Sequence, residues 1–102
     1  MTDVLEYTFE NNNKQVSLEA VAEVAAMTKN SFCKYFKKVT NKTYFEFLKE
    51  IRVKHACKLI RKQMDLRIID VAYLCGFKNV SNFNKQFKTV TTLSPSGFKK
   101  LI

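Results

Sequence analysis

Glycine and proline are scarce in this chain: its 102 residues include two glycines and one proline, and there is no tryptophan. All-β folds need glycine and proline at many of their corners, so this scarcity argues against them. Hydrophobic residues still make up 46% of the chain, the usual globular share, which excludes wholesale disorder. The composition predicts one all-α domain, or two very small units that share a core.

Side chains that bind metals or form disulfides are also few. The three cysteines, Cys33, Cys57 and Cys75, are an odd number without CxxC spacing, and His55 is the only histidine. They provide neither disulfide pairs nor closely spaced zinc ligands, so we expect no metal, no cofactor and a reduced, cytoplasmic protein. No apolar run approaches the roughly 20 residues of a membrane span, and the start lacks a signal-peptide pattern.

The same shortage argues against an enzyme. A cysteine nucleophile needs a neighbouring base, and His55 would have to serve. On a helix, His55 and Cys57 point about 200° apart, and Cys57 and Cys75 stand in apolar patterns typical of inert core thiols. We therefore expect no catalytic residues.

Basic residues outnumber acidic ones by 18 to 9, a net charge of +9. Residues 1–27 hold one basic and five acidic residues and carry −4, whereas residues 28–102 hold 17 basic and four acidic residues and carry +13. So localised a positive field attracts polyanions, although a merely solvated basic surface fits the charge alone equally well.

Apolar periodicity predicts three short helices at the start of the chain. They cover residues 3–12, 18–25 and 29–39, with Ser17 and Thr28 capping the second and third. In the third helix, Phe32, Phe36 and Val39 mark the buried side. Asn41 ends it, because asparagine tolerates the left-handed conformation better than most residues.

The longest predicted helix runs from Thr43 to about Lys62, and its apolar face changes sides halfway. At 100° per residue, two apolar groups fall on roughly opposite sides. They are Tyr44, Phe47, Leu48 and Ile51, followed by Val53, Ala56, Cys57 and Ile60. A helix that serves one core has one apolar face, so we expect a strut between two small cores. A central helix buried all round is the alternative, and Phe45 and Leu59 fit it better.

The second half of the chain repeats the first. LEAVA at 18–22 matches IIDVA at 68–72 with an offset of 50, and FCKYFK at 32–37 matches FNKQFK at 83–88 with an offset of 51. One extra residue must therefore lie in the second turn, where Gly76 stands, and glycine suits a tight turn between crossing helices. Each unit reads as a helix-turn-helix, the motif that places its second helix in the DNA major groove.

Residues 68–100, IIDVAYLCGFKNVSNFNKQFKTVTTLSPSGFKK, resemble the signature region of the AraC/XylS family of bacterial transcription regulators. The matching positions there are Ala72, Gly76, Phe77, Phe83, Phe87, Lys88, Pro95, Phe98 and Lys99. Upstream matches to the family are Phe36, Lys37, Lys38, Tyr44, Leu48, Arg52 and Ala56. The resemblance covers about residues 4–102, effectively the whole chain.

Four positions depart from the family pattern. Glycine usually ends each recognition helix where Asn41 and Thr92 stand. Asn41 is a mild substitute, but β-branched Thr92 would be strained at positive φ, so we expect that helix end to be built differently. Phe98-Lys99 replaces the usual Tyr-Arg and loses the guanidinium fork.

The resemblance implies an all-α DNA-binding domain of about seven helices, in which a long central linker helix joins two helix-turn-helix subdomains. We divide the chain into an N-terminal helix (1–15), a first unit (16–42), the linker helix (43–62) and a second unit (63–102). The resemblance also implies a C-terminal place in a longer regulator, whose sensing or dimerisation domain is absent from this sequence.

The solvent sides of the two recognition helices should carry the residues that bind DNA. In the first helix, Asn30 suits adenine, Lys34 suits guanine and Cys33 allows a short contact. The expected base contacts of the second helix are Val80, Ser81, Asn84 and Lys85. The expected phosphate contacts are Lys37, Lys38, Lys78 and Lys88. The alternatives are a merely solvated helix face and, for the second unit, contact with the DNA backbone alone.

Three residues are assigned structural roles: Arg52, Asp70 and Gly76. Arg52 has no apolar reason for its place, and the family keeps arginine there, so we expect it to pair with Asp70 and fix the linker helix against the second unit. The lone His55 is interpreted as a packing or surface residue.

These features predict sequence-specific binding of double-stranded DNA and regulation of transcription. The linker helix spans roughly 28–30 Å and major-groove faces recur every ~34 Å, so one chain could read an asymmetric site across two adjacent grooves. RNA polymerase is a further expected partner, and no membrane is expected. The alternatives are nonspecific architectural DNA binding and a basic module that binds proteins or membrane surfaces.

Overall fold

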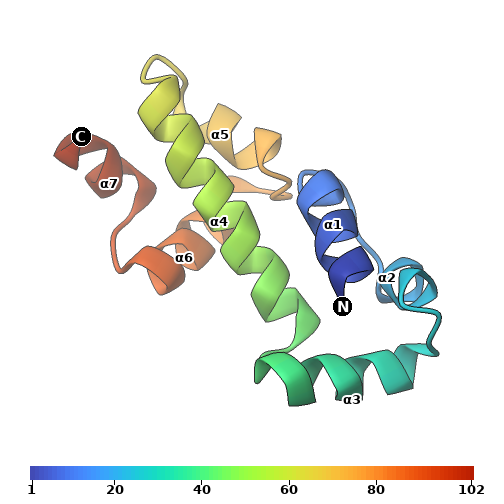
Figure 1. Ribbon diagram of the computed structural model, residues 1–102. Helices are drawn as coiled ribbons and strands as arrows, with labels where there is room; N and C mark the ends of the chain where they lie inside the picture. The colour runs from blue at the N-terminus through green and yellow to red at the C-terminus, as the bar shows by residue number, and fades with distance from the viewer.

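The computed structural model describes residues 1–102 as seven α-helices without strands (Figure 1). In chain order they are α1 (Thr2–Asn11), α2 (Leu18–Val24), α3 (Lys29–Thr40), α4 (Tyr44–Lys62), α5 (Ile68–Leu74), α6 (Val80–Thr91) and α7 (Pro95–Leu101). The molecule is elongated, with extents of 43 × 22 × 21 Å. The predicted all-α architecture of two helix-turn-helix units joined by a long helix is confirmed.

Helix α4 separates two hydrophobic cores. The first contains Val4, Val21, Ala22, Phe32, Phe36, Tyr44 and Leu48. The second contains Val53, Ala56, Ile60, Val71, Ala72, Cys75, Phe77, Phe83 and Phe87. Because α4 contributes its first half to one core and its second half to the other, the strut is confirmed. The alternative of a helix buried all round is wrong, since Phe45 is 42% exposed.

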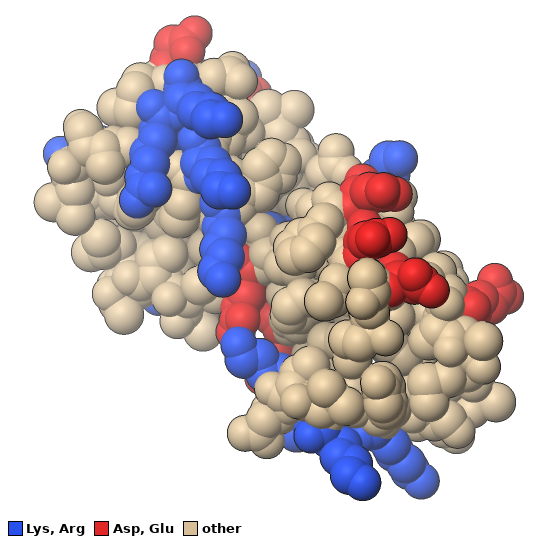
Figure 2. Space-filling view, viewed as in Figure 1, with Lys and Arg blue, Asp and Glu red and all other residues tan.

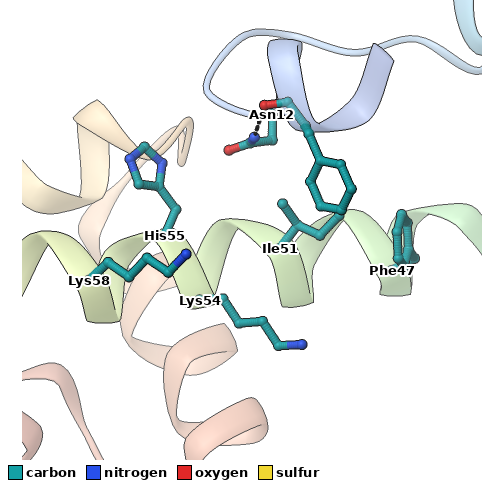
Figure 3. A pocket seen from close by; sticks show the side chains of 7 residues that line it. Asn12, Phe47, Ile51, Lys54, His55 and Lys58 are labelled. Carbon is teal, nitrogen blue, oxygen red and sulfur yellow. Dashed lines mark hydrogen bonds between the residues drawn. The ribbon is translucent and has the colours of Figure 1, made fainter. Parts of the chain in front are cut away.

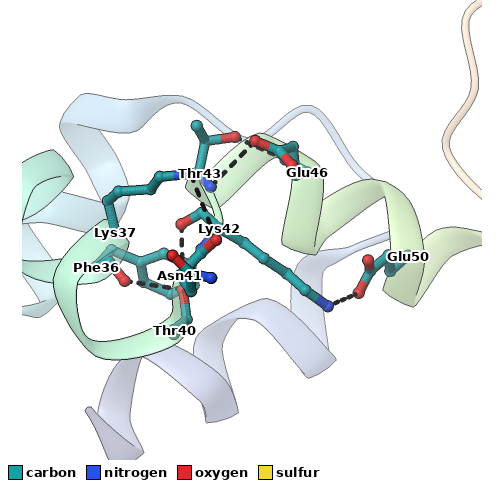
Figure 4. A network of polar contacts seen from close by, with 8 residues as sticks. All are labelled: Phe36, Lys37, Thr40, Asn41, Lys42, Thr43, Glu46 and Glu50. Carbon is teal, nitrogen blue, oxygen red and sulfur yellow. Dashed lines mark hydrogen bonds and ion pairs between the residues drawn. The ribbon is translucent and has the colours of Figure 1, made fainter.

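The joint between α3 and α4 is built from local polar contacts (Figure 4). Asn41 ends α3 in the left-handed conformation, at φ 62°. Thr43 then caps α4 in a reciprocal arrangement with Glu46, a capping box. The Lys42 ammonium pairs with the Glu50 carboxylate at 2.7 Å. These contacts fix the direction in which α4 leaves the first unit.

The ends of the two recognition helices are built alike. Thr40 and Thr91, 51 residues apart, each donate to the carbonyl oxygen four residues earlier, at 2.8 and 2.9 Å. The next residues, Asn41 and Thr92, both take the left-handed conformation, with φ of 62° and 69°. The expectation that Thr92 ends its helix differently is therefore wrong: the repeated hydrogen bonds hold threonine in a conformation that β-branched side chains disfavour.

The repeat continues beyond α6 into α7. Phe98 packs on Phe87 with ring centroids 5.6 Å apart, as Phe47 packs on Phe36 at 5.5 Å. Helix α7 therefore takes the place in the second unit that the first turns of α4 take in the first. The expectation that Val39 lies on the buried side of α3 is wrong, because its side chain is 54% exposed beyond the end of the first core.

The two turns within the units share their geometry up to one inserted residue. Gly76 and Ala26, 50 residues apart, both have positive φ, of 90° and 56°. The capping residues that follow, Asn79 and Thr28, are 51 apart. The inserted residue is therefore Lys78, directly before the cap of α6. At Gly76, a Cβ would lie 2.8 Å from the Asn12 carbonyl oxygen, so glycine is required there.

Arg52 does not pair with Asp70, so that predicted ion pair is wrong. Its Nε donates to the carbonyl oxygen of Asn12 at 2.7 Å, and its second guanidinium nitrogen donates to the carbonyl oxygen of Lys14 at 2.8 Å. Asp70 instead pairs with Arg67, three residues earlier, at 3.0 Å. Backbone carbonyls left unpaired by the end of α1 thus determine where the guanidinium lies.

Candidate nucleic-acid interface

Helices α3 and α6 are each held by two buried phenylalanines one turn apart. Phe32 and Phe36 anchor α3, Phe83 and Phe87 anchor α6, and none of the four is measurably exposed. The N-terminal ends are capped by Thr28, which accepts from the Ser31 N–H, and by Asn79, which accepts from the Asn82 N–H. One side of each helix is therefore fixed to its core, and the opposite side faces solvent.

The outer side of α3 exposes four of the five residues expected to bind DNA from this helix. Asn30, Lys34 and Lys38 are exposed. Lys37 is also exposed, and its ammonium donates to the Asn41 carbonyl oxygen at the helix end, at 3.3 Å (Figure 4). Figure 2 shows basic side chains projecting from the free edge of the molecule at α3. This surface combines amide and ammonium donors that suit base edges and phosphates.

Cys33 lies closer to the protein than its neighbours on α3. Its side chain is half-buried and lines a mainly apolar hollow of about 330 Å³ with Leu18, Tyr44 and Phe45. Among the expected base contacts on α3, Cys33 is therefore the least accessible.

The outer side of α6 is arranged in the same way. Ser81, Asn84, Lys85 and Lys88 are exposed, and Val80 is half-buried at the first position of the helix. The candidate residues of the two units thus occupy equivalent faces of equivalent helices.

A polar hollow of about 230 Å³ lies between the two units, and sequence reasoning missed Lys49, one of its residues. Its lining includes the expected phosphate contact Lys78, Lys49 of α4, Asn79 at the cap of α6, and Asn82 of α6. Lys49 also lines the neighbouring hollow against α6. Its register on α4, on the same side as Val53 and Ala56, was the signal that could have identified it.

Two of the thiols are unsuited to nucleophilic chemistry. Burial raises the pKa of the Cys75 thiol to about 12 and also raises that of Cys57, which suppresses the reactive thiolate. No group of three or more His, Cys, Asp or Glu side chains is placed to hold a metal ion. None of the helices combines the length and apolar character that crossing a membrane requires.

Comparison with known proteins places this arrangement in a family. A family model described as a helix-turn-helix domain matches residues 21–101. The melibiose operon regulatory protein of Escherichia coli K12 is 26% identical over 101 residues, which are 99% of this chain and 33% of that protein. This chain spans between 25% and 55% of the length of the curated relatives it matches.

Solved structures share the whole fold. The DNA-binding domain of AdpA, a global transcriptional factor crystallised with a target DNA, superimposes with a TM-score of 0.90 at 24% identity, covering 98% of this chain and 89% of that one. A probable AraC family regulator from Rhodopseudomonas palustris CGA009 has a TM-score of 0.89 at 21% identity, covering 98% and 94%. With the family model matching most of its length, this chain belongs to the AraC-type family of helix-turn-helix domains.

Proposed function

We propose that this chain binds double-stranded DNA sequence-specifically, with α3 and α6 in adjacent major grooves, and thereby regulates transcription. The observation that carries the proposal is the matched pair of exposed faces, with Asn30 and Lys34 on one helix and Asn84 and Lys85 on the other. Asparagine suits adenine and lysine suits the acceptors of guanine. Neither Lys34 nor Lys85 forms an ion pair within the chain, so both ammonium groups are free to bind DNA.

The length of α4 supports simultaneous contact with two grooves. Its 19 residues span about 28 Å at 1.5 Å per residue, and major-groove faces recur every ~34 Å along DNA. The two helices differ in sequence, so the site they read is asymmetric. Val80, Ser81 and Cys33 supply further, weaker contacts to the bases in the major groove.

Phosphate contacts supply most of the affinity. Lys37, Lys38, Lys78 and Lys88 carry them, as expected from the sequence, and we add Lys49, which lines the hollow between the two units with Lys78. Neutralising about six phosphates would give a slope near −5 for log K against log salt concentration.

The role of the whole protein follows from its relatives. They are named as transcriptional regulators, and this chain spans only 25% to 55% of their length. We infer that the whole protein is a bacterial cytoplasmic regulator with a separate sensing or dimerisation domain. This chain, with subdivisions that end at residues 15, 42 and 62, would be the part that holds the DNA. It would also contact RNA polymerase, and it would have no catalytic role.

Selection of bound duplexes from a random library, followed by a salt titration on the selected site, tests the proposal. We expect an asymmetric site with two short blocks about one helical turn apart, and a steep negative salt slope. Equal affinity for selected and random duplexes would support the alternative of nonspecific architectural binding. A slope near zero would exclude DNA as the partner.

A further inference from the structure

The side of the molecule formed by α1 and α4 has no part in the proposed DNA contacts. The two helices are joined at Thr8, which shares a hydrogen bond with the Tyr44 hydroxyl at 2.6 Å, and at Asn12 through Arg52. Between them lies a groove of about 370 Å³ (Figure 3). Its apolar wall is formed by Phe9, Phe47 and Ile51, and Phe9 is 59% exposed.

The polar end of the groove contains two buried atoms without a hydrogen-bond partner. They are Oδ1 of Asn12, a residue only 9% exposed, and Nδ1 of His55. Figure 3 shows the Asn12 carboxamide oxygen turned toward His55. Buried polar atoms of this kind are usually satisfied, so these two are exceptions within the fold.

Charged residues flank the groove in two rows of opposite sign. Asp3, Glu6 and Glu10 recur at i, i+3 and i+7 along α1, and all three are exposed. Lys54, Lys58 and Lys62 recur at i, i+4 and i+8 along α4, and all three are exposed. None of the six takes part in an ion pair within the chain. Figure 2 shows acidic side chains over α1 and basic ones over α4 on the same face.

The two rows match in length and point away from the recognition helices. Each covers about 10–12 Å of its helix at 1.5 Å per residue. On α4 the lysine row lies on the side opposite Val53 and Ile60, which pack in the core that α6 shares. An occupant of this face would therefore leave α3 and α6 free.

We propose that this face pairs with the same face of a second copy of the chain in a two-fold symmetric dimer. In such an interface, residue i meets residue j and j meets i. A two-fold axis that runs along the groove lays the acidic row of each copy on the lysine row of the other and covers Phe9. An axis across the groove would set acidic rows against each other, so the charge pattern selects one orientation.

The association is expected to be weak. Each copy carries a net charge of +9, so two copies repel each other at long range. At about 0.15 M salt the screening length is about 8 Å, which suppresses this repulsion while close ion pairs persist. Exposed ion pairs add little each, but symmetry counts every one twice. This inference does not depend on the proposed DNA binding.

Sedimentation of the full chain from about 20 µM to about 1 mM, with paired charge reversals, tests the dimer. The wild-type chain should dimerise, whereas Glu6→Lys with Glu10→Lys, and separately Lys54→Glu with Lys58→Glu, should each weaken dimerisation at least about tenfold. An equimolar mixture of the two reversed chains should form a heterodimer, because the rows are again complementary. Lys37→Glu with Lys38→Glu, the same charge change on α3, should dimerise like the wild type.

Concentration-dependent NMR shifts of the wild-type chain provide a second measurement that needs no variant to fold. The shifts should fall on Glu6, Phe9 and Lys54 and spare Asn30 and Lys34. In sedimentation, any of three results would overturn the proposal: a monomeric wild-type chain, reversed chains that dimerise normally, or a mixture that stays monomeric. In the NMR experiment, shifts confined to α3 would overturn it.

Discussion

Arg52 on α4 holds the segment after α1 through the carbonyl oxygen of Asn12, to which its Nε donates at 2.7 Å. A second bond from the same guanidinium reaches the Lys14 carbonyl oxygen at 2.8 Å. Burial lowers the pKa of Arg52 from its ordinary value, which leaves it charged at neutral pH because that value is so high. The central helix is thereby tied to the N-terminal segment, a connection of 40 residues in sequence.

Replacing Arg52 should therefore destabilise the fold. Arg52→Ala removes both bonds to backbone carbonyls, and we expect the free energy of unfolding to fall by about 2–3 kcal/mol in a urea titration. Arg52→Lys should recover only part of the loss, since a point charge lacks the fork of donors. Asp70→Asn is the control: it removes only the exposed pair with Arg67 and should change little. Equal losses from Arg52→Ala and Asp70→Asn would contradict this assignment.

Gly76 and Ala26 occupy equivalent turns, so Gly76→Ala and Ala26→Gly should change the free energy of unfolding in opposite directions. Gly76→Ala places a methyl group 2.8 Å from the Asn12 carbonyl oxygen at φ +90° and should cost at least about 2 kcal/mol of unfolding free energy. Ala26→Gly relieves an alanine at φ 56° and should stabilise by about 1 kcal/mol. Thermal unfolding followed by circular dichroism measures both, and a neutral Gly76→Ala would refute the steric argument.

Thr92 offers a stabilising substitution at the end of α6. Its φ of 69° is costly for a β-branched residue and free for glycine, so Thr92→Gly should raise the free energy of unfolding by about 1 kcal/mol. Asn41→Gly at the equivalent end of α3 should gain less, because asparagine already tolerates this conformation. A loss of stability in Thr92→Gly would show that its side chain makes contacts worth more than the strain.

The buried thiol of Cys75 should make the fold sensitive to alkali. Its pKa is raised from 9.0 to about 12, so the unfolded chain releases this proton more easily than the folded one. The stability it contributes is complete below about pH 9 and is lost as the pH rises toward about 12. Urea unfolding of the wild-type chain and Cys75→Ala at several pH values isolates the effect: only the wild type should show this part of the decline. Near pH 8, iodoacetamide should modify Cys75 only after unfolding.

Two lysines should separate base reading from phosphate binding. Lys34→Ala removes a donor for guanine on α3, so it should cost about 1–3 kcal/mol on the selected site and relax preference at one position. Lys88→Ala should weaken binding to all duplexes alike and reduce the salt slope by about one. Fluorescence anisotropy measures the affinity of each variant for three duplexes: the selected site, a site altered at one base pair, and a random sequence. Reversed behaviour of the two variants would exchange their assigned roles.

Local and repeated features could be read from the sequence alone. The caps at Ser17, Thr28 and Thr43, the left-handed Asn41 and the switch of apolar face along α4 depend on residues within a few positions of one another. The internal repeat and its single insertion also follow from spacing. For these reasons the sequence by itself determined the helices, the two cores and the faces that the recognition helices present.

Contacts between distant segments were decided only by the tertiary structure. The partner of Arg52 depends on where the end of α1 leaves its carbonyls unpaired, which charge matching with Asp70 could not foresee. Lys49 enters the hollow between the units because α4 packs against α6. The groove between α1 and α4, with its facing charge rows, exists only once both helices are packed. A periodic pattern determines which side of a helix is buried, whereas the neighbour that meets each exposed side is determined by the packing of the whole chain.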